Sequence, residues 1–86
     1  MSVVFQKPYS YSLYVYDNVW YVTYLSGGPL ESGVSIRLNS DEISLVHDNQ
    51  TELEKLIKKF KKEPSLYAGR EISPVVTSNG PPAKNN

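Results

Sequence analysis

The hydrophobic period of this sequence changes once, between residues 38 and 41. Through residues 3–38 apolar side chains alternate with polar ones, which is typical of β-strands with one buried face. Through residues 41–62 they recur every three or four positions, which is typical of an amphipathic helix. This order predicts the α+β class: an antiparallel β-meander of three to four strands packed against one long C-terminal amphipathic helix.

The stretch YSYSLYVYDNVWYVTYL, residues 9–25, predicts a hairpin. Asp17-Asn18 separates two β-prone runs, and both residue types tolerate the left-handed backbone of a two-residue turn. This turn fixes the register, because a slip of one residue would exchange the two faces of the sheet. The predicted cross-strand pairs are Tyr11–Tyr24, Ser12–Thr23, Leu13–Val22, Tyr14–Tyr21, Val15–Trp20 and Tyr16–Val19.

The register gives the sheet an apolar face and an amphipathic face. The apolar face is expected to form the core, and its residues are Leu13, Val15, Trp20, Val22, Val34, Ile36 and Leu38. The helix residues expected to meet it are Ile43, Val46, Leu53, Leu56, Ile57 and Phe60. The opposite face is expected to be half exposed, and it carries Ser12, Tyr14, Tyr16, Tyr21, Thr23, Ser35 and Arg37.

The helix has clear start and stop signals. Asn39 and Glu42 have the spacing of a capping box, and Pro64 ends the helix. Thr51 and Glu54 form a second such pair, so a break near residues 47–50 is an alternative, with residues 42–48 as a strand. We expect one helix. At the two ends of the chain, VVFQK is a further strand or the bent start of the next one, and SLYAGREI is a short edge strand or a loosely packed segment.

Length and composition limit the organisation of the chain. With 86 residues we expect one domain, over residues 1–76, and a disordered polar tail over residues 77–86. LSGGPLESG, residues 25–33, is expected to be a flexible connection. A domain of this size buries a small core, so covering more apolar surface in a homodimer would stabilise it.

Charge and residue usage exclude several classes of function. The net charge is zero and the sequence pI is about 6.6, which argues against a chain built mainly to neutralise phosphate. Cysteine is absent and His47 is the only histidine, so no metal site, cofactor site or catalytic group is predicted, and we expect no enzymatic activity. No apolar run approaches the roughly 20 residues of a membrane span, and MSVVFQK does not resemble a signal peptide. We therefore expect a cytoplasmic protein.

The amphipathic face is the candidate binding site. Tyr14, Tyr16 and Tyr21 have rings that can stack on unpaired bases, and Arg37 lies on the same side of the sheet. Further positive charge is expected from Lys7 and Arg70 and from the end of the helix, at Lys58, Lys59, Lys61 and Lys62. Tyrosine is also enriched at protein–protein contacts, so the same face is also typical of a partner or dimer interface.

The segment GVSIRLNSDEISLVHDNQTELEKLIKKF resembles part of a known family. A β-meander, a last strand of the form G-x-S-x-x-L, a cap and an amphipathic helix, over residues 3–62, are similar to the positive-cofactor-four transcriptional coactivators. The resemblance implies a ββββα domain that dimerises through its helix and binds single-stranded DNA on its sheet. Two functions are therefore carried forward: a small non-enzymatic protein that binds single-stranded nucleic acid, and a protein–protein interaction module such as a regulator, an inhibitor or an immunity-type protein.

Overall fold

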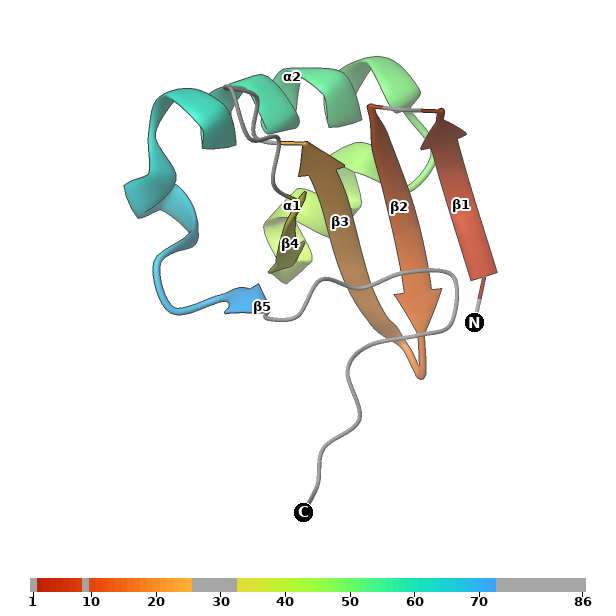
Figure 1. The fold of residues 1–86 in the computed structure, drawn as a ribbon. Coiled ribbons are helices and arrows are strands. Elements are labelled where there is room, and N and C mark those ends of the chain that lie inside the picture. Colours follow the sequence, from red (N-terminus) through yellow and green to blue (C-terminus); the bar gives the residue numbers. More distant parts are fainter. Residues whose placement is uncertain (1, 9, 26–32, 73–86) are drawn as a thin grey trace.

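A five-stranded antiparallel meander forms the centre of the molecule. The structure is a computed structural model that describes residues 2–8, 10–25 and 33–72. The strands pair in chain order as β1 (Ser2–Lys7), β2 (Tyr11–Tyr16), β3 (Val19–Leu25), β4 (Gly33–Arg37) and β5 (Glu71–Ile72) (Figure 1). The predicted α+β class and antiparallel meander are confirmed, but the sheet has five strands and not three to four. VVFQK belongs to a strand of its own, and the end of SLYAGREI forms a short edge strand. The predictions for the tail and for most of the glycine-rich connection lie outside the described residues.

The hairpin of β2 and β3 has the register that the two-residue turn predicts. Asp17 and Asn18 have φ angles of 53° and 65°, the left-handed region that a tight hairpin turn needs. Each predicted pair from Tyr11–Tyr24 to Tyr16–Val19 is present. The composition of each face of the hairpin therefore follows from the turn.

Two helices follow the sheet, so the prediction of one long helix is wrong. They are α1 (Ser40–Val46) and α2 (Gln50–Lys62), and a short 3-10 helix, η1 (Pro64–Tyr67), comes next. The capping box of Asn39 and Glu42 at the start of α1 is confirmed, which also rules out a strand at residues 42–48. Asn49, and not Thr51, caps α2, because its side chain accepts a hydrogen bond from the backbone N–H of Glu52.

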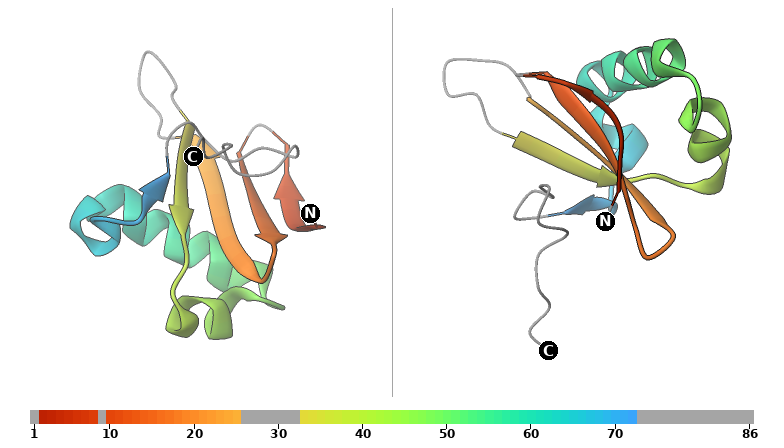
Figure 2. Two further views of the ribbon diagram at one scale, coloured as in Figure 1. Left: turned by 90° about the horizontal axis from the view of Figure 1, so that it is seen from below. Right: turned by 90° about the vertical axis from the view of Figure 1, so that its right-hand side faces the viewer.

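The break has a packing reason. A continuous helix over residues 40–62 would be about 35 Å long and straight, and could follow the sheet in one direction only. With the turn between them, α1 and α2 cross the same face of the sheet in different directions (Figure 2). Both bury side chains there, Val46 from α1 and Leu53 and Phe60 from α2. No helix in the described part of the chain is long and apolar enough to cross a membrane.

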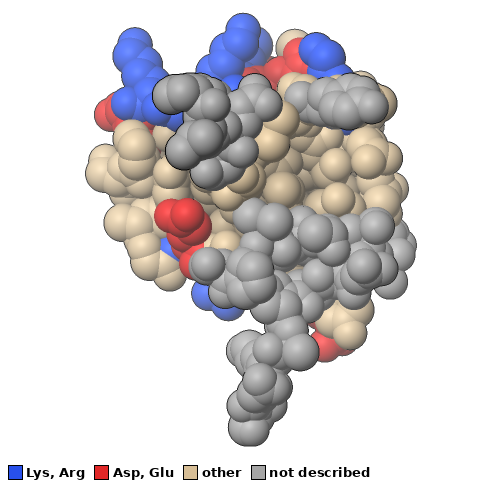
Figure 3. All heavy atoms as spheres, in the orientation of Figure 1, with Lys and Arg blue, Asp and Glu red and all other residues tan. Residues whose placement is uncertain are grey.

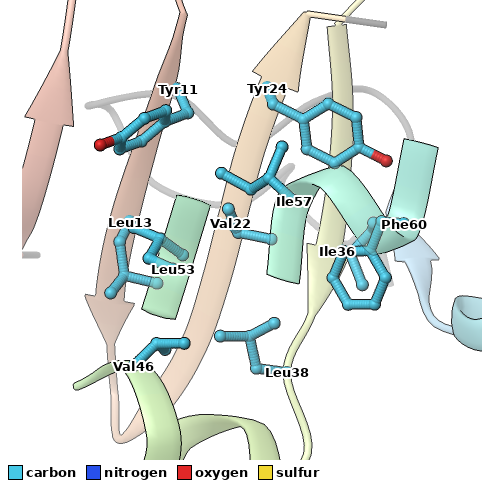
Figure 4. Packing of buried hydrophobic residues seen from close by; sticks show 10 residues of the cluster. All are labelled: Tyr11, Leu13, Val22, Tyr24, Ile36, Leu38, Val46, Leu53, Ile57 and Phe60. Atoms are coloured by element: carbon cyan, nitrogen blue, oxygen red, sulfur yellow. The ribbon is translucent and has the colours of Figure 1, made fainter. Parts of the chain in front are cut away.

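The main core lies between this face and the two helices (Figure 4). Its buried residues are Tyr11, Leu13, Val22, Tyr24, Ile36, Leu38, Val46, Leu53, Ile57 and Phe60. Trp20, Val34, Ile43 and Leu56 pack against it while partly exposed, as does Phe5 from β1. Val15, which the pattern places in the core, is half buried and is not part of this cluster, because it lies beside the turn at the end of the sheet.

The opposite face of the sheet is less exposed than the sequence predicts. Tyr14 is 6% exposed and Tyr21 is 9% exposed, and they form a second cluster with Val19 and Ile72. Tyr14 and Tyr21 are a direct cross-strand pair, and Ile72 reaches this face because β5 pairs with β4. The sheet is therefore buried on both faces at its centre.

Candidate functional sites

The tyrosine face does not present the row of rings that stacking on bases needs. Tyr14 and Tyr21 are buried, so the two ring faces at the centre of the predicted site are covered. Tyr16 is 44% exposed, and Arg37, which pairs with Tyr21 across β3 and β4, is also exposed. Between the strands, the hydroxyl oxygens of Thr23 and Ser35 lie 2.7 Å apart and share a hydrogen bond. The centre of this face has the properties of a core.

The predicted basic residues divide between two places. Arg37 lies on the sheet, whereas Lys58, Lys59, Lys61 and Lys62 are all exposed along α2. In Figure 3 most of the visible Lys and Arg side chains lie along the upper border, where Figure 1 places α2, and a smaller group lies at the lower left. Because the helices cover the face opposite Tyr14 and Tyr21, the tyrosines and the lysines do not form one continuous site.

A first hollow, the lysine cavity, lies between α2 and the end of the sheet where β1 leads into β2. It has a volume of about 210 Å³ and is lined by Lys7, Ser10, Tyr11, Glu54, Ile57, Lys58 and Lys61. Lys58 and Lys61 are three residues apart, so they project from the same face of α2. Lys7 comes from the end of β1, which brings two distant segments of the sequence to the same cavity.

Hydrogen bonds fix the wall of the lysine cavity. The hydroxyl of Tyr11 donates to Glu54 Oε2 at 2.6 Å and accepts from Gln50 Nε2 at 2.7 Å. Burial, and then the hydrogen bond to Glu54, raise the pKa of Tyr11 above its ordinary value, so it remains a neutral phenol. Glu54 is the only acidic residue among the described residues that line the cavity, and its carboxylate accepts a hydrogen bond from Tyr11.

Lys61, which lines the lysine cavity, also contacts an aromatic ring of the sheet. Lys61 Nζ lies 5.7 Å from the centroid of the Tyr24 ring, within the range of a cation–π contact. Burial, and then a hydrogen bond with Tyr67, raise the pKa of Tyr24 well above its ordinary value. The partner of Lys61 at this contact is a neutral ring and not a carboxylate. The contact therefore does not neutralise the positive charge of Lys61.

A second hollow, the leucine groove, lies between α1, α2 and η1. It has a volume of about 330 Å³ and is lined by Asn39, Asp41, Glu42, Leu45, Leu56, Lys59, Phe60, Leu66 and Arg70. Phe60 is fully buried, whereas Leu45 and Leu66 are 55% and 44% exposed. Two exposed leucines beside a hollow with a largely apolar lining form an apolar surface whose contact with water is unfavourable.

An ion pair closes one part of the leucine groove. Arg70 Nη1 lies 2.6 Å from Glu42 Oε1 and Nη2 lies 3.0 Å from Oε2, so the contact is bidentate. Arg70 also donates to the backbone carbonyls of Arg37 and Leu66, and the hydrogen bond with Glu42 raises its pKa. The expectation that Arg70 adds free positive charge is therefore wrong, because Glu42 neutralises it.

The structure shows no arrangement typical of catalysis at the one histidine. His47 caps the end of α1, and its Nε2 lies 3.8 Å from Asp48 Oδ1 in an exposed position. Within residues 2–8, 10–25 and 33–72, no group of three or more His, Cys, Asp or Glu side chains is placed to hold a metal ion. The hollows on the surface of the described residues are the features from which a function can be argued.

Sequence comparison adds no relative to this description. No family model, no curated protein and no solved structure matches the chain. The fold therefore describes a small two-layer α+β domain, with hollows beside its helices.

Sequence reasoning missed the exposed leucines of the leucine groove and the contact between Tyr11 and Glu54 at the lysine cavity. Leu45 and Leu66 were not singled out, although Leu45 falls outside the three-and-four spacing of Val46 and Leu53, which is a signal of exposure. The sequence does not indicate that Tyr11 and Glu54 are in contact, because they are 43 residues apart in the chain.

Proposed function

We propose that this chain is a non-enzymatic protein–protein interaction module, and that the leucine groove is its docking surface. The observation that carries the proposal is the pair of exposed leucines, Leu45 and Leu66, beside the buried Phe60. Regulators, inhibitors and immunity-type proteins act in this way, by covering a surface of another protein. Among the two functions carried forward from the sequence, this one is also favoured by the zero net charge.

The occupant we infer is a short segment of a partner protein that presents one Leu- or Phe-sized side chain next to a carboxylate. The groove volume of about 330 Å³ is sufficient for such an anchor together with part of its backbone. An apolar anchor would remove Leu45 and Leu66 from water, which is the main source of affinity at the centre of an interface.

The charges at the rim support a partner with this chemistry. Glu42 and Arg70 neutralise each other, so they require no charge from the occupant. Lys59 and Asp41 also line the groove, and among the described residues neither has an ion-pair partner. A carboxylate beside the anchor would complement Lys59, and such rim charges contribute to specificity and association rate.

Shortening one groove leucine tests the proposal. Peptides would be selected from a displayed random library on the folded domain, and their dissociation constants measured. We expect them to share an apolar anchor and an acidic residue, and Leu66→Ala to weaken their binding about tenfold, as the loss of a buried apolar contact does. Val3→Ala is the matched control, because Val3 is 45% exposed on β1, away from the groove.

Two outcomes would contradict the proposal. One is a set of peptides without an apolar anchor, or with affinity that Leu66→Ala and Val3→Ala reduce equally. The other is a stable homodimer in sedimentation experiments that Leu66→Ala dissociates, because the groove would then be occupied by a second copy. The homodimer expected from the small core stays a prediction, and the same sedimentation run tests it.

Binding of single-stranded nucleic acid is the second candidate function, and the lysines of α2 favour it more than the tyrosines do. Six lysines, Lys7, Lys55, Lys58, Lys59, Lys61 and Lys62, lie on β1 and α2. If they contact phosphates, a fluorescently labelled single strand of about 20 nucleotides should show a saturable rise in anisotropy at low salt, with affinity falling steeply as salt rises. A duplex of the same length is the control. Absence of a saturable rise with the single strand would remove this function.

A further inference from the structure

We propose that the lysine cavity binds the phosphate group of a small organic phosphate. Lys7, Lys58 and Lys61 line it against one acidic residue, Glu54. Phosphate groups are bound in proteins by lysine ammonium groups acting as point charges and by neutral hydrogen-bond donors. Ser10, whose hydroxyl is such a donor, is part of the same lining.

Among the described residues, the three lysines form no ion pair. The ion pairs formed by the described residues are His47–Asp48, Lys55–Glu52 and Arg70–Glu42, and none involves the lysine cavity. Glu54 supplies the one carboxylate among the described lining residues, and it accepts the hydrogen bond of Tyr11. Positive charge that is concentrated in a hollow and exceeds its counter-charge favours an anion from solution.

The cavity is also held in shape before any ligand arrives. Tyr11 is fixed by hydrogen bonds to Glu54 and Gln50, which tie β2 to α2. Lys61 is placed by its contact with the Tyr24 ring. A site whose walls are already ordered loses less conformational entropy on binding, so a small anion can be held with useful affinity.

A neighbouring hollow indicates that the ligand is larger than phosphate itself. It has a volume of about 290 Å³, and it shares Lys7, Ser10 and Tyr11 with the lysine cavity. Its other described lining residues include Thr23, Tyr24 and Leu25 from β3, so the surface becomes more apolar away from the lysines. The organic part of a nucleotide-sized phosphate would occupy this second hollow while its phosphate contacts the lysines.

Isothermal titration at low ionic strength, with inorganic pyrophosphate and with ADP as separate probes, tests the site. We expect both to bind saturably, and ADP to bind more tightly because its nucleoside contacts the neighbouring hollow. Lys58→Gln and Lys61→Gln should each weaken both probes about fivefold, through loss of one charge near the phosphate. Glu54→Gln should strengthen binding about threefold, because it removes the opposing charge and keeps an acceptor for Tyr11.

The matched control is Lys62→Gln, which removes the same charge from the same helix outside the cavity lining. It should change either affinity less than twofold, and thermal melting should show that all four variants are folded. Failure of both probes to bind the wild-type protein would overturn the proposal. Equal weakening by Lys62→Gln and Lys58→Gln would also overturn it, as would binding of a single-stranded oligonucleotide without binding of either small probe.

Discussion

Replacing Phe60 by alanine is expected to lower the free energy of unfolding by about 3–5 kcal/mol. Phe60 is fully buried in the main core, where α2 meets the sheet. Its ring also makes an edge-to-face contact with Tyr67, with centroids 5.4 Å apart and planes at 83°. Small domains have unfolding free energies of about 5–15 kcal/mol, so this variant should lose a large part of its stability.

Urea denaturation followed by Trp20 fluorescence measures this effect. The matched control is Phe5→Ala, because Phe5 is the other phenylalanine of the chain and is only partly buried against the same core. Phe5→Ala should lower the free energy of unfolding clearly less than Phe60→Ala, since fewer contacts are removed and the space left is open to water. Equal losses for the two variants would mean that α2 does not pack on the sheet as described.

Replacing Tyr14 by alanine should also destabilise the domain, by about 2–4 kcal/mol. Tyr14 is 6% exposed and packs with Tyr21, Val19 and Ile72 on the face of the sheet away from the helices. A tyrosine that serves only to bind a ligand from solution could be removed with little effect on folding. The size of the loss therefore distinguishes a second core from a binding face.

Tyr16→Ala is the matched control, because Tyr16 lies two residues further along β2 on the same face and is 44% exposed. Tyr16→Ala should lower the free energy of unfolding by less than about 1 kcal/mol, as substitutions of exposed residues usually do. The same denaturation experiment compares the two variants. If Tyr14→Ala leaves the unfolding free energy unchanged, the tyrosine face becomes the leading candidate for a binding site again.

The hairpin could be predicted residue by residue because its information is local. Asp17 and Asn18 allow a two-residue turn, and the turn alone determines that Tyr14 faces Tyr21. The capping box of Asn39 and Glu42 is local in the same way, since both hydrogen bonds join residues three apart. Features of this kind are encoded within a few residues and can be read directly.

The helix break could not be predicted from periodicity. Val46, Gln50 and Leu53 continue the spacing of three and four across the turn. The hydrophobic pattern is therefore the same as that of one continuous helix. The deciding residue is Asn49, whose side chain caps α2 at Glu52 and competes with continuation of the helix. A cap is worth about 1 kcal/mol, and packing of both helices on the sheet selects it.

The candidate sites depend on contacts between segments that are distant in the sequence. This is why the residues predicted to form one site lie in different parts of the structure. Ile72 belongs to a two-residue strand and packs on Tyr14 and Tyr21 only because β5 joins the edge of the sheet. Lys7 meets Lys58 and Lys61 only after β1 and α2 are placed. Arg70 is paired with Glu42 across 28 positions of sequence. No periodicity or residue spacing in the sequence indicates any of these contacts.

Amide chemical-shift mapping is the most direct test that this domain acts as a protein-binding module through the leucine groove. A peptide selected for binding would be titrated into the isotopically labelled domain. The expected result is saturable shifts for residues of α1, α2 and η1 around Leu45, Phe60 and Leu66, with little change at Tyr14 and Tyr21. The largest shifts at Tyr14 and Tyr21, with an unperturbed groove, would contradict the proposed function.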